Sequence, residues 1–218
     1  MKAEFWHSKW ENNEIGFHQP DVNAYLAQYW SCLGLQGDET VLVPLCGKSQ
    51  DMVWLHRRGH SVLGVELSEK ALADFLLEND LDARTAEHHQ FCGYELQDMT
   101  LFCGDFFHLS AVDCRAVKAV YDRAALIALP LEGRRRYAAH LRDILPPDVP
   151  IMLIGLDYEQ AKRQGPPFAV PDEEVRDLFG DDYDIDILAT ASFERKGVFT
   201  LETAYRLLPK SSAMGGNI

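Results

Sequence analysis

The chain has 218 residues, 47% of them hydrophobic, and a formal net charge of -13. This length suits one domain covering 1–218 with a single sizeable core. The charge argues against nucleic acid or an anionic membrane surface as a partner, and no apolar run is long enough to span a bilayer. The basic cluster Arg134–Arg136 falls on a predicted helix and is interpreted as a solvated face.

The cysteines number five, an odd count without a CxxC pair, and no secretory segment precedes them. They are Cys32, Cys46, Cys92, Cys103 and Cys114. This usage is typical of a reducing compartment, so the sequence predicts a cytoplasmic protein. We expect a monomer that acts on a small molecule.

The first 33 residues are expected to form a lid followed by a packing helix. Trp6 and Trp10 are four residues apart, so on a helix they share one face. They either pin a terminal helix to the domain or close it over a cationic or planar ligand, because an aromatic face attracts cations. Phe17, in the loop that follows, either lines a pocket or plugs the core.

A buried strand and a tight turn come after the packing helix. Val41 to Leu45 is a short apolar run rich in β-branched residues, which predicts a strand. Gly47 supplies the backbone freedom for a sharp turn, and Ser49 is a good N-cap for the next helix. In an open α/β sheet, ligands bind where strand ends meet helix N-termini, so Leu45 and Gly47 are placed at a cofactor site.

The next predicted strand, Ser61 to Glu66, ends in an acid. The offset of about 20 residues from the turn is usual for a carboxylate that holds a ribose hydroxyl pair. Glu66 is therefore the leading cofactor-binding candidate. Ser68 then caps a predicted helix over Glu69–Glu78, which completes a βαβ unit.

Histidines give no strong metal signal. Residues 84–98 are polar and ambiguous in pattern, and the pair His88–His89 within them is interpreted as surface rather than as ligands. His56 and His60 have i,i+4 spacing, but Gly59 between them predicts a helix end. No metal site is expected.

A third strand over Thr100–Cys103 ends at Gly104 and Asp105. Asp105 either accepts a hydrogen bond from an exocyclic amine, such as that of adenine, or caps a turn.

A fourth strand is predicted over Val117–Tyr121. Asp122 and Arg123 follow at its carboxyl end, on the side of the sheet where the cofactor site is expected. On chemistry alone, this charged pair is either a structural ion pair or part of the site.

The rest of the chain is predicted as a helix over 132–145, a strand over 151–156, a loop over 157–171, a helix over 172–179 and strands over 183–191 and 198–207. The loop contains Gly165–Phe168 and is long enough to suggest a pocket wall, with Phe168 as a candidate substrate contact. The last two strands alternate like an antiparallel hairpin at a sheet edge. Residues 211–218 are expected to be disordered.

These elements predict an α/β fold with a Rossmann-like class I methyltransferase sheet. It is expected to be mostly parallel, with seven strands, a C-terminal antiparallel hairpin, helices on both faces and an N-terminal helical lid. The first turn lacks the GxGxxG that a pyrophosphate needs, so a dinucleotide fits poorly. S-adenosylmethionine has no phosphate and needs a ribose acid, an adenine slot and a place for its amino-acid end. It is the predicted cofactor.

Several motifs occur in one order along the chain. They are Phe5-Trp6 through Trp10, Gly16-Phe17-His18-Gln19, Pro44-Leu45-Cys46-Gly47-Lys48, Gly59-His60-Ser61-Val62 with Gly64-Val65-Glu66, Asp122-Arg123, and Gly165-Pro166-Pro167-Phe168 with Val170-Pro171. Together they resemble thiopurine S-methyltransferase, and the similarity runs from about Phe5 to Leu207.

The resemblance implies roles for individual residues. The expected S-adenosylmethionine contacts are Trp10, Leu45, Glu66 and Arg123, with Gly104 and Asp105 at the adenine and Trp6 in the lid. Phe17 and Arg123 are the expected substrate contacts. Asp105 is an acid where the vertebrate form carries an apolar residue.

The implied reaction transfers a methyl group from S-adenosylmethionine to the sulfur of small aromatic or heterocyclic thiols such as thiopurines. A heteroaromatic thiol ionises near neutral pH, so no general base is required and positioning carries most of the rate. Arg123 is expected to attract or orient the substrate anion, and Asp122 is expected to hold the planar guanidinium of Arg123 in place. Cys46 is interpreted as a small turn residue rather than a nucleophile.

Other functions stay open. Bacterial members of the family are linked to methylation of selenium and tellurium compounds, an alternative physiological role. A protein that binds S-adenosylmethionine without turnover is a non-enzymatic alternative. A nicotinamide-dependent dehydrogenase is opposed by the missing glycines. Amine acceptors are disfavoured, because Asp122-Arg123-Ala124-Ala125 stands where amine methyltransferases carry an Asn/Asp-Pro-Pro-Tyr run.

Overall fold

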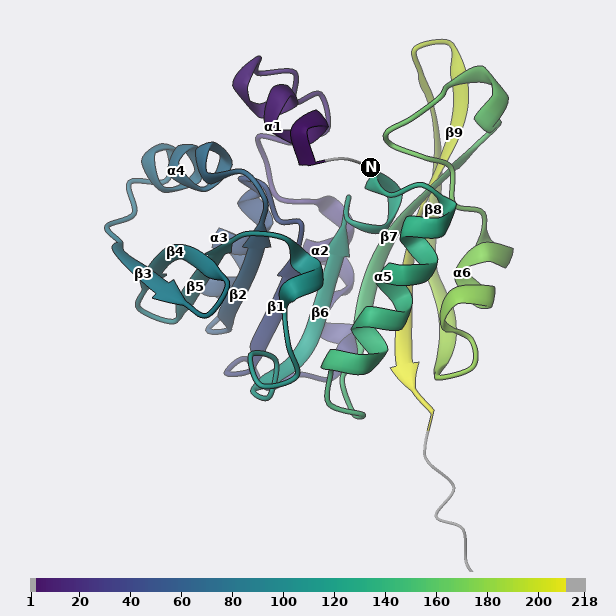
Figure 1. Ribbon diagram of the computed structural model, residues 1–218. Coiled ribbons are helices and arrows are strands. Elements are labelled where there is room, and N and C mark those ends of the chain that lie inside the picture. The colour runs from purple at the N-terminus through teal and green to yellow at the C-terminus, as the bar shows by residue number, and fades with distance from the viewer. Residues whose placement is uncertain (1–2, 211–218) are drawn as a thin grey trace, which may run out of the picture.

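The computed structural model describes residues 3–210, which form a nine-stranded mixed sheet flanked by helices (Figure 1). The strands are β1 (Thr40–Pro44), β2 (Ser61–Glu66), β3 (Arg84–His88), β4 (Phe91–Leu96), β5 (Met99–Cys103), β6 (Val117–Arg123), β7 (Ile151–Tyr158), β8 (Tyr183–Arg195) and β9 (Val198–Pro209). Their order in the sheet is β3-β4-β5-β2-β1-β6-β7-β9-β8.

The helices differ in length and in the layer they occupy. The α-helices are α1 (Ala3–Glu11), α2 (Ala24–Tyr29), α3 (Gln50–Arg57), α4 (Glu69–Glu78), α5 (Leu131–Ile144) and α6 (Asp172–Phe179). Short 3-10 helices are η1 (Trp30–Leu33), η2 (Phe106–His108), η3 (Leu126–Ala128) and η4 (Gln160–Lys162). Figure 1 shows α5 in front of the sheet and α3 behind it.

The parallel centre of the sheet reverses its chain order between β1 and β6. β1 pairs with β2 on one side, from Thr40 opposite Ser61 to Pro44 opposite Val65, and with β6 on the other. The helix after β1 packs on one face and the helix after β6 on the other, so a crevice opens between the carboxyl ends of these strands. An open α/β sheet binds its ligand at this switch point.

The sheet has two more strands than the seven that the sequence predicts, because residues 84–98 fold into the hairpin β3–β4. β4 pairs antiparallel with β5, and a Cβ added to Gly93 would lie 1.9 Å from the Leu101 carbonyl oxygen. Only glycine permits this backbone approach. β3 is an edge strand with no buried residue, so it lacks the period-2 pattern that reveals a strand in sequence.

Two hydrophobic cores form, one on each face of the sheet. On the first face, Leu42 and Val120 belong to a cluster that also contains Tyr137 of α5. On the second face, Val41 belongs to a cluster that contains Met52 of α3. Neighbouring strand residues therefore enter different cores, as expected for a central strand covered on both sides.

Capping residues begin the helices where the sequence predicts. The hydroxyls of Ser49 and Ser68 each accept a backbone N–H from the first turn of α3 and α4. The helices α4 and α6 have the predicted bounds. The predicted C-terminal hairpin is confirmed as the antiparallel pair β8–β9, and it extends beyond the predicted ends.

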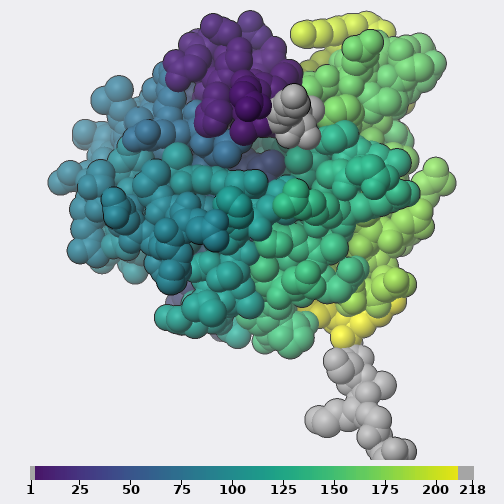
Figure 2. All heavy atoms as spheres, viewed as in Figure 1, coloured from purple at the N-terminus to yellow at the C-terminus, as the bar shows by residue number. Residues whose placement is uncertain are grey.

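The N-terminal helix α1 lies over the carboxyl end of the parallel strands (Figure 1), and Figure 2 shows its atoms beside those of the β8–β9 hairpin. Within residues 3–210, no helix has the length and apolar character needed to cross a membrane. The predicted disordered tail, 211–218, lies outside the described residues.

Candidate active site

A cavity of about 600 Å³ opens at the carboxyl ends of β1, β2 and β6, beneath α1. This volume is in the range of small-molecule sites. The cavity brings together most of the predicted site residues. Those that line it are Trp6, Trp10, Phe17, Leu45, Gly47, Glu66, Gly104, Asp105 and Arg123. Asp122 and Phe168 are not among the lining residues.

The turn after β1 has a backbone conformation that few residue types adopt. Leu45 has φ 48° and Gly47 has φ 54°, both left-handed, and a leucine in this region stores conformational strain. The Cys46 N–H donates to the Val65 carbonyl at 3.0 Å, which ties the turn to β2. A Cβ on Gly47 would lie 3.0 Å from the Trp10 ring. The glycine therefore lets the indole approach the turn closely.

Glu66 ends β2 with its carboxylate at the cavity wall and only 7% exposed. Its Oε2 accepts the Gly47 N–H and its Oε1 accepts the Ser68 N–H, both at 2.9 Å. Burial raises the pKa of Glu66, although these hydrogen bonds favour the ionised form. Each oxygen can accept a further hydrogen bond, and a ribose offers two adjacent hydroxyl donors.

Three aromatic side chains form the wall that the N-terminal segment contributes. α1 places Trp6 and Trp10 within reach of Phe17, whose ring centroid lies 5.8 Å and 5.5 Å from theirs. Both contacts are edge-to-face, which is a favourable arrangement. Trp10 is 3% exposed. The helix is therefore packed onto the domain, and the same rings cover the cavity.

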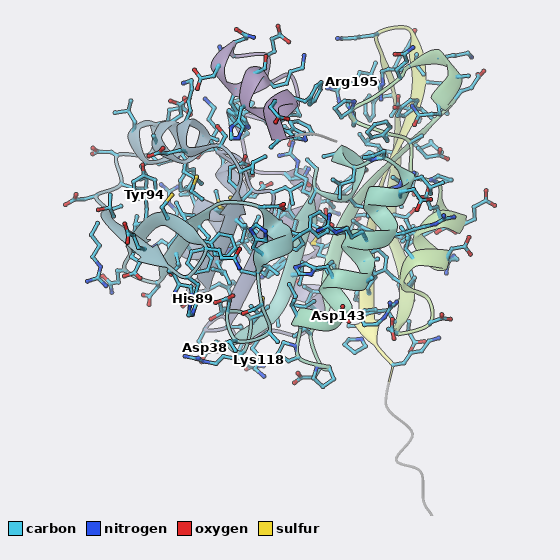
Figure 3. The ribbon with its side chains drawn as sticks, in the orientation of Figure 1. Asp38, His89, Tyr94, Lys118, Asp143 and Arg195 are labelled. Carbon is cyan, nitrogen blue, oxygen red and sulfur yellow. The ribbon has the colours of Figure 1, made fainter. Side chains whose placement is uncertain are left out.

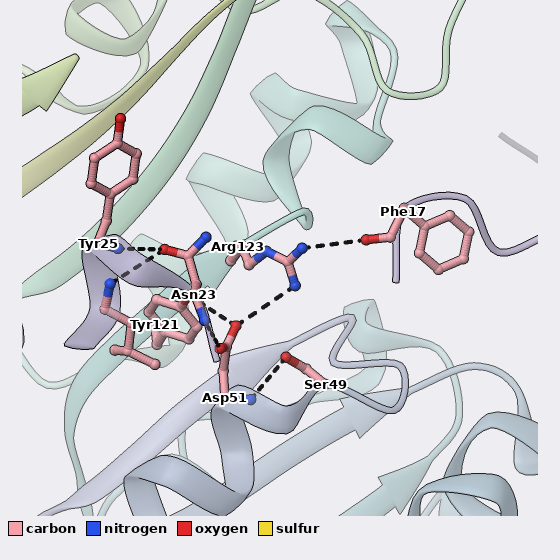
Figure 4. A network of polar contacts seen from close by, with 8 residues as sticks. Phe17, Asn23, Tyr25, Ser49, Asp51, Tyr121 and Arg123 are labelled. Carbon is pink, nitrogen blue, oxygen red and sulfur yellow. Dashed lines mark hydrogen bonds and ion pairs between the residues drawn. The ribbon is translucent and has the colours of Figure 1, made fainter. Parts of the chain in front are cut away.

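Arg123 ends β6 and reaches the cavity (Figure 4). Its Nη2 donates to the Phe17 carbonyl at 3.3 Å, and its Nη1 lies 3.7 Å from Asp51 Oδ2. Asp51 is fully buried and is fixed in turn: Oδ1 accepts the Asn23 N–H at 2.7 Å, and Oδ2 accepts the Tyr121 hydroxyl at 3.0 Å. A buried carboxylate with satisfied hydrogen bonds thus orients the guanidinium.

Asp122 does not hold Arg123, which corrects the expected role. Successive strand residues point to opposite faces, so the two side chains diverge. Asp122 Oδ2 accepts the Tyr137 hydroxyl at 2.7 Å, and Oδ1 accepts the Leu126 N–H at 3.1 Å. Burial raises the pKa of Asp122 to about 6. Asp51 takes the place beside the guanidinium that the sequence assigns to Asp122.

Gly104 and Asp105 follow β5 at another side of the cavity. The Gly104 N–H donates to the Glu66 carbonyl at 2.8 Å, so this segment is anchored to the end of β2. Asp105 Oδ1 accepts the Phe107 N–H at 3.0 Å and caps η2. The turn-capping alternative is therefore realised, and Asp105 also lines the cavity.

The loop between β7 and α6 forms a pocket wall, as predicted, but through its prolines. Pro166 and Pro167 line the cavity, and both follow cis peptide bonds. The Phe168 N–H donates to the Ile127 carbonyl at 2.7 Å, and its ring packs beside Gly165. The candidate substrate contact in this loop therefore moves from Phe168 to the two prolines.

The tip of the β8–β9 hairpin supplies lining residues that the sequence pattern does not single out. Phe193, Arg195 and Glu202 reach the cavity. Arg195 lies at the side of the hairpin that faces α1 (Figure 3), and its Nη2 donates to the Gly16 carbonyl at 2.8 Å. Burial raises the pKa of Glu202. No local pattern reveals this contact, because it joins residues near the two ends of the chain.

Cys46, His18 and Lys48 also line the cavity, and they do not form a nucleophile paired with a general base. Cys46 is buried, and burial raises the pKa of its thiol well above the usual range, so it stays protonated at neutral pH. Burial also lowers the pKa of His18. Lys48 Nζ lies 2.6 Å from Glu78 Oε1 in an ion pair. The buried, protonated thiol supports the interpretation of Cys46 as a turn residue and not as a nucleophile.

The residues present meet the needs of S-adenosylmethionine. The Glu66 carboxylate suits a ribose diol, and the aromatic rings under α1 suit a sulfonium cation. A Cβ on Gly104 would lie 2.7 Å from the Phe91 ring, so glycine at this position lets the segment before Asp105 pack closely against β4.

Comparison with known proteins agrees with this assignment. The sequence profile described as thiopurine S-methyltransferase matches residues 1–210. A thiopurine S-methyltransferase of Pseudomonas fluorescens is 47% identical, covering 98% of this chain and 100% of that protein. One of Pseudomonas aeruginosa is also 47% identical, covering 96% of this chain and 100% of that protein.

A solved structure supports the fold. The Burkholderia thailandensis 1,6-didemethyltoxoflavin-N1-methyltransferase, determined with bound S-adenosylhomocysteine, matches with a TM-score of 0.62 and 14% identity. The match covers 94% of this chain and 87% of that one. With the switch-point cavity, the family match over residues 1–210 and the near full-length identity taken together, the chain belongs to the thiopurine S-methyltransferase family of S-adenosylmethionine-dependent enzymes.

Proposed function

We propose that the chain methylates the ionised sulfur of small heteroaromatic thiols such as thiopurines, with Arg123 orienting the thiolate. The observation that carries this assignment is the Arg123 guanidinium, held at the cavity wall by Asp51 and the Phe17 carbonyl. A guanidinium keeps its charge throughout the physiological pH range, so it offers an anion a permanent partner.

The donor side of the cavity is assigned to the carboxyl ends of β1, β2 and β5. When bound, S-adenosylmethionine supplies an electrophilic methyl group on a sulfonium. Glu66 would accept the ribose hydroxyls. The other residues that would hold the cofactor are Trp6, Trp10, Leu45, Gly47, Gly104, Asp105 and Arg123. Asp105 keeps one carboxylate oxygen beyond the one that caps η2, which leaves an acceptor for the adenine amine.

The acceptor side is assigned to the region of Arg123, Arg195 and Phe17. The guanidiniums of Arg123 and Arg195 at this side of the cavity favour an anion, and the rings and prolines beside them favour a planar apolar body. The chain carries a net charge of -13, so general attraction does not bring such an anion in and local cations are needed.

Catalysis in this proposal rests on positioning. A thiolate needs no proton removed, so neither Cys46 nor His18 is required as a base. The protein contributes by aligning the sulfur and by keeping water away, through the cover of α1 and the hairpin tip. Fixed groups such as the Asp51–Arg123 pair are already oriented before the acceptor arrives.

A second physiological role, methylation of selenium or tellurium compounds, would use the same cavity and the same arginines, Arg123 and Arg195. An anionic, polarisable centre on a small molecule would meet the same guanidiniums and the same donor. The two roles therefore differ in the acceptor and share the residues.

The test is a labelled-methyl assay of the purified chain. The acceptors are 6-mercaptopurine, a small selenol, tellurite, and an amine and a catechol of similar size. We expect turnover of the thiol and none of the amine or catechol. Turnover of the amine or catechol without the thiol overturns the assignment. Binding of S-adenosylmethionine without turnover of any acceptor indicates the passive binding protein instead.

The oligomeric state and compartment are part of the proposal. The cavity is complete within a single chain, and all five cysteines are free thiols, which supports a monomer working in a reducing cytoplasm. Sedimentation of the purified chain tests the first point. A species of twice the chain mass at working concentration contradicts it.

A further inference from the structure

Outside the cavity, three metal-binding side chains converge at the turn of the β3–β4 hairpin. His88 ends β3, His89 follows it in the turn, and Asp113 comes from the loop after η2. One donor atom of each residue lies within 4.8 Å of the other two. Figure 3 shows His89 at the lower edge of the β3–β4 hairpin, well away from Arg195.

We propose that His88, His89 and Asp113 form a binding site for a divalent transition-metal ion of the zinc type, with water in the remaining position. Two imidazoles and one carboxylate are a ligand set that Zn²⁺ uses, whereas Mg²⁺ and Ca²⁺ require oxygen ligands. The strongly negative chain favours the approach of any cation.

Two of the three ligands are already held in place. His88 Nε2 lies 2.7 Å from Asp113 Oδ1, and the His88 ring stacks on Phe102 with a centroid distance of 5.1 Å. Asp113 Oδ2 accepts both the Ser110 N–H at 2.8 Å and the Ser110 hydroxyl at 2.6 Å. Such partners orient a ligand and strengthen a metal site.

The burial of the Asp113 carboxylate favours the binding of a cation beside it. The Asp113 side chain is 4% exposed, and the ring of His88 beside it is 43% exposed. The two oxygens of Asp113 are held by the Ser110 N–H and hydroxyl and by His88 Nε2, so the carboxylate is fixed beside the two imidazoles. A dication bound at this position would be close to a carboxylate that is largely removed from water.

The exposed histidine supplies the adjustable ligand. The His89 side chain makes no hydrogen bond to any residue within 3–210, and its ring lies 4.5 Å from that of His88. In a tetrahedral zinc site with bonds of about 2.1 Å, ligand atoms are separated by about 3.4 Å. Rotation of the exposed His89 side chain can reduce the distance from its ring nitrogen to the ligand atoms of His88 and Asp113, now within 4.8 Å, without moving the core.

The site would join two segments that flank the cavity wall. In the sequence, the hairpin turn precedes β5 and the Ser110–Asp113 loop follows Gly104–Phe107, a segment that lines the cavity. A bound ion is therefore expected to raise the thermal unfolding midpoint, because it binds the folded chain more tightly than the unfolded one. This site is independent of the methyl-transfer proposal.

The experiment uses the full chain, purified without a polyhistidine tag, kept reduced and stripped of metal by a chelator. Zn²⁺ affinity is measured by competition with a chromophoric chelator, with Mg²⁺ as comparison. We expect one equivalent of Zn²⁺ and no comparable Mg²⁺ binding. His89→Ala, a surface change, and Asp113→Asn, which keeps an acceptor for Ser110, should each weaken Zn²⁺ binding roughly tenfold or more.

Two matched variants separate this site from other ligands. His108→Ala removes an exposed histidine at the end of η2, and Cys92→Ser removes an exposed thiol on β4. Both should bind Zn²⁺ like the parent chain, and bound Co²⁺ should show no sulfur-to-metal charge-transfer band. Equal affinity in the parent and His89→Ala, or loss of binding in Cys92→Ser, overturns the proposal.

Discussion

Asp51 Oδ2 lies 3.7 Å from Arg123 Nη1, so the first turn of α3 and the end of β6 meet through one ion pair beside the cavity. The same carboxylate accepts the Asn23 N–H that precedes α2. One buried group thus connects the switch-point strand, the packing helix and the cation assigned to the acceptor (Figure 4).

Asp51→Asn should lower kcat/KM for a thiolate acceptor by about tenfold or more, which corresponds to ~1.4 kcal/mol. The amide can still accept the Asn23 N–H, but it cannot balance or orient the guanidinium. Steady-state kinetics with 6-mercaptopurine measure the change. The control is Tyr121→Phe, which removes one hydrogen bond to Asp51 and leaves the ion pair; it should change kcat/KM much less. Equal losses in both variants would assign Asp51 a purely structural role.

Arg123→Lys should retain part of the turnover and Arg123→Met should lose most of it. Lysine keeps the charge and loses the planar fork that contacts Phe17 and Asp51 together, whereas methionine loses both. Because Arg123 is also assigned to the donor side, the affinity for S-adenosylhomocysteine is measured separately by calorimetry. Full activity in Arg123→Met would remove the guanidinium from the acceptor site.

Glu66→Ala should weaken S-adenosylhomocysteine binding more than tenfold, through loss of a charge-assisted contact of about 1.5–3 kcal/mol. Glu66→Gln is the gentler variant, because its amide oxygen still accepts one of the two backbone N–H groups. Glu69→Ala removes an exposed acid three residues further on and is the matched control. Calorimetric titration compares the three, and an unchanged affinity in both Glu66 variants excludes a ribose contact.

Binding of S-adenosylhomocysteine should slow hydrogen exchange over residues 5–17. The rings of Trp6, Trp10 and Phe17 pack on one another and line the cavity, so a ligand beneath them adds contacts that oppose local opening. Exchange in α6, which contributes no lining residue, serves as the reference. The same exchange at 5–17 with and without ligand would mean that α1 is packed permanently and does not act as a lid.

The buried carboxylate of Asp122 should make stability fall as pH rises through its range. Its folded-state pKa of about 6 lies above the ordinary value of 3.8, so the folded chain binds the extra proton between these values. Its contribution is therefore fully present below about pH 4 and lost as pH rises through 6, by up to about 3 kcal/mol. Urea unfolding of the parent and Asp122→Asn from pH 4 to 7 tests this. A constant stability difference between them contradicts the shift.

The central strands and their turns could be predicted because their signals are local. The run from Val41 to Leu45, the glycine at 47 and the serine cap at 49 are each set by neighbouring residues, and Glu66 follows at a fixed offset in the same βαβ unit. The hairpin β3–β4 could not be predicted in this way. β3 is an edge strand with no buried residue, so its sequence shows no apolar alternation, and Gly93 is explained only by the β5 backbone beside it.

The fold class, the acid at the end of β2, the aromatic N-terminal helix and the arginine at the end of β6 could all be predicted from the sequence, because periodicity, capping and motif order depend on consecutive residues. The carboxylate that pairs with that arginine could be identified only from the folded chain. Asp122 is its chain neighbour, yet the strand directs it to the opposite face, while Asp51 arrives from another element.

Contacts between distant parts of the chain also place Arg195 at the cavity and Asp113 beside His88, so neither position could be predicted from the sequence. Each of these contacts joins segments that are brought together by strand order and helix packing, and no spacing along the chain encodes them. Local sequence therefore fixes what each element is and which residues it offers, whereas the partners of those residues depend on how the sheet is assembled.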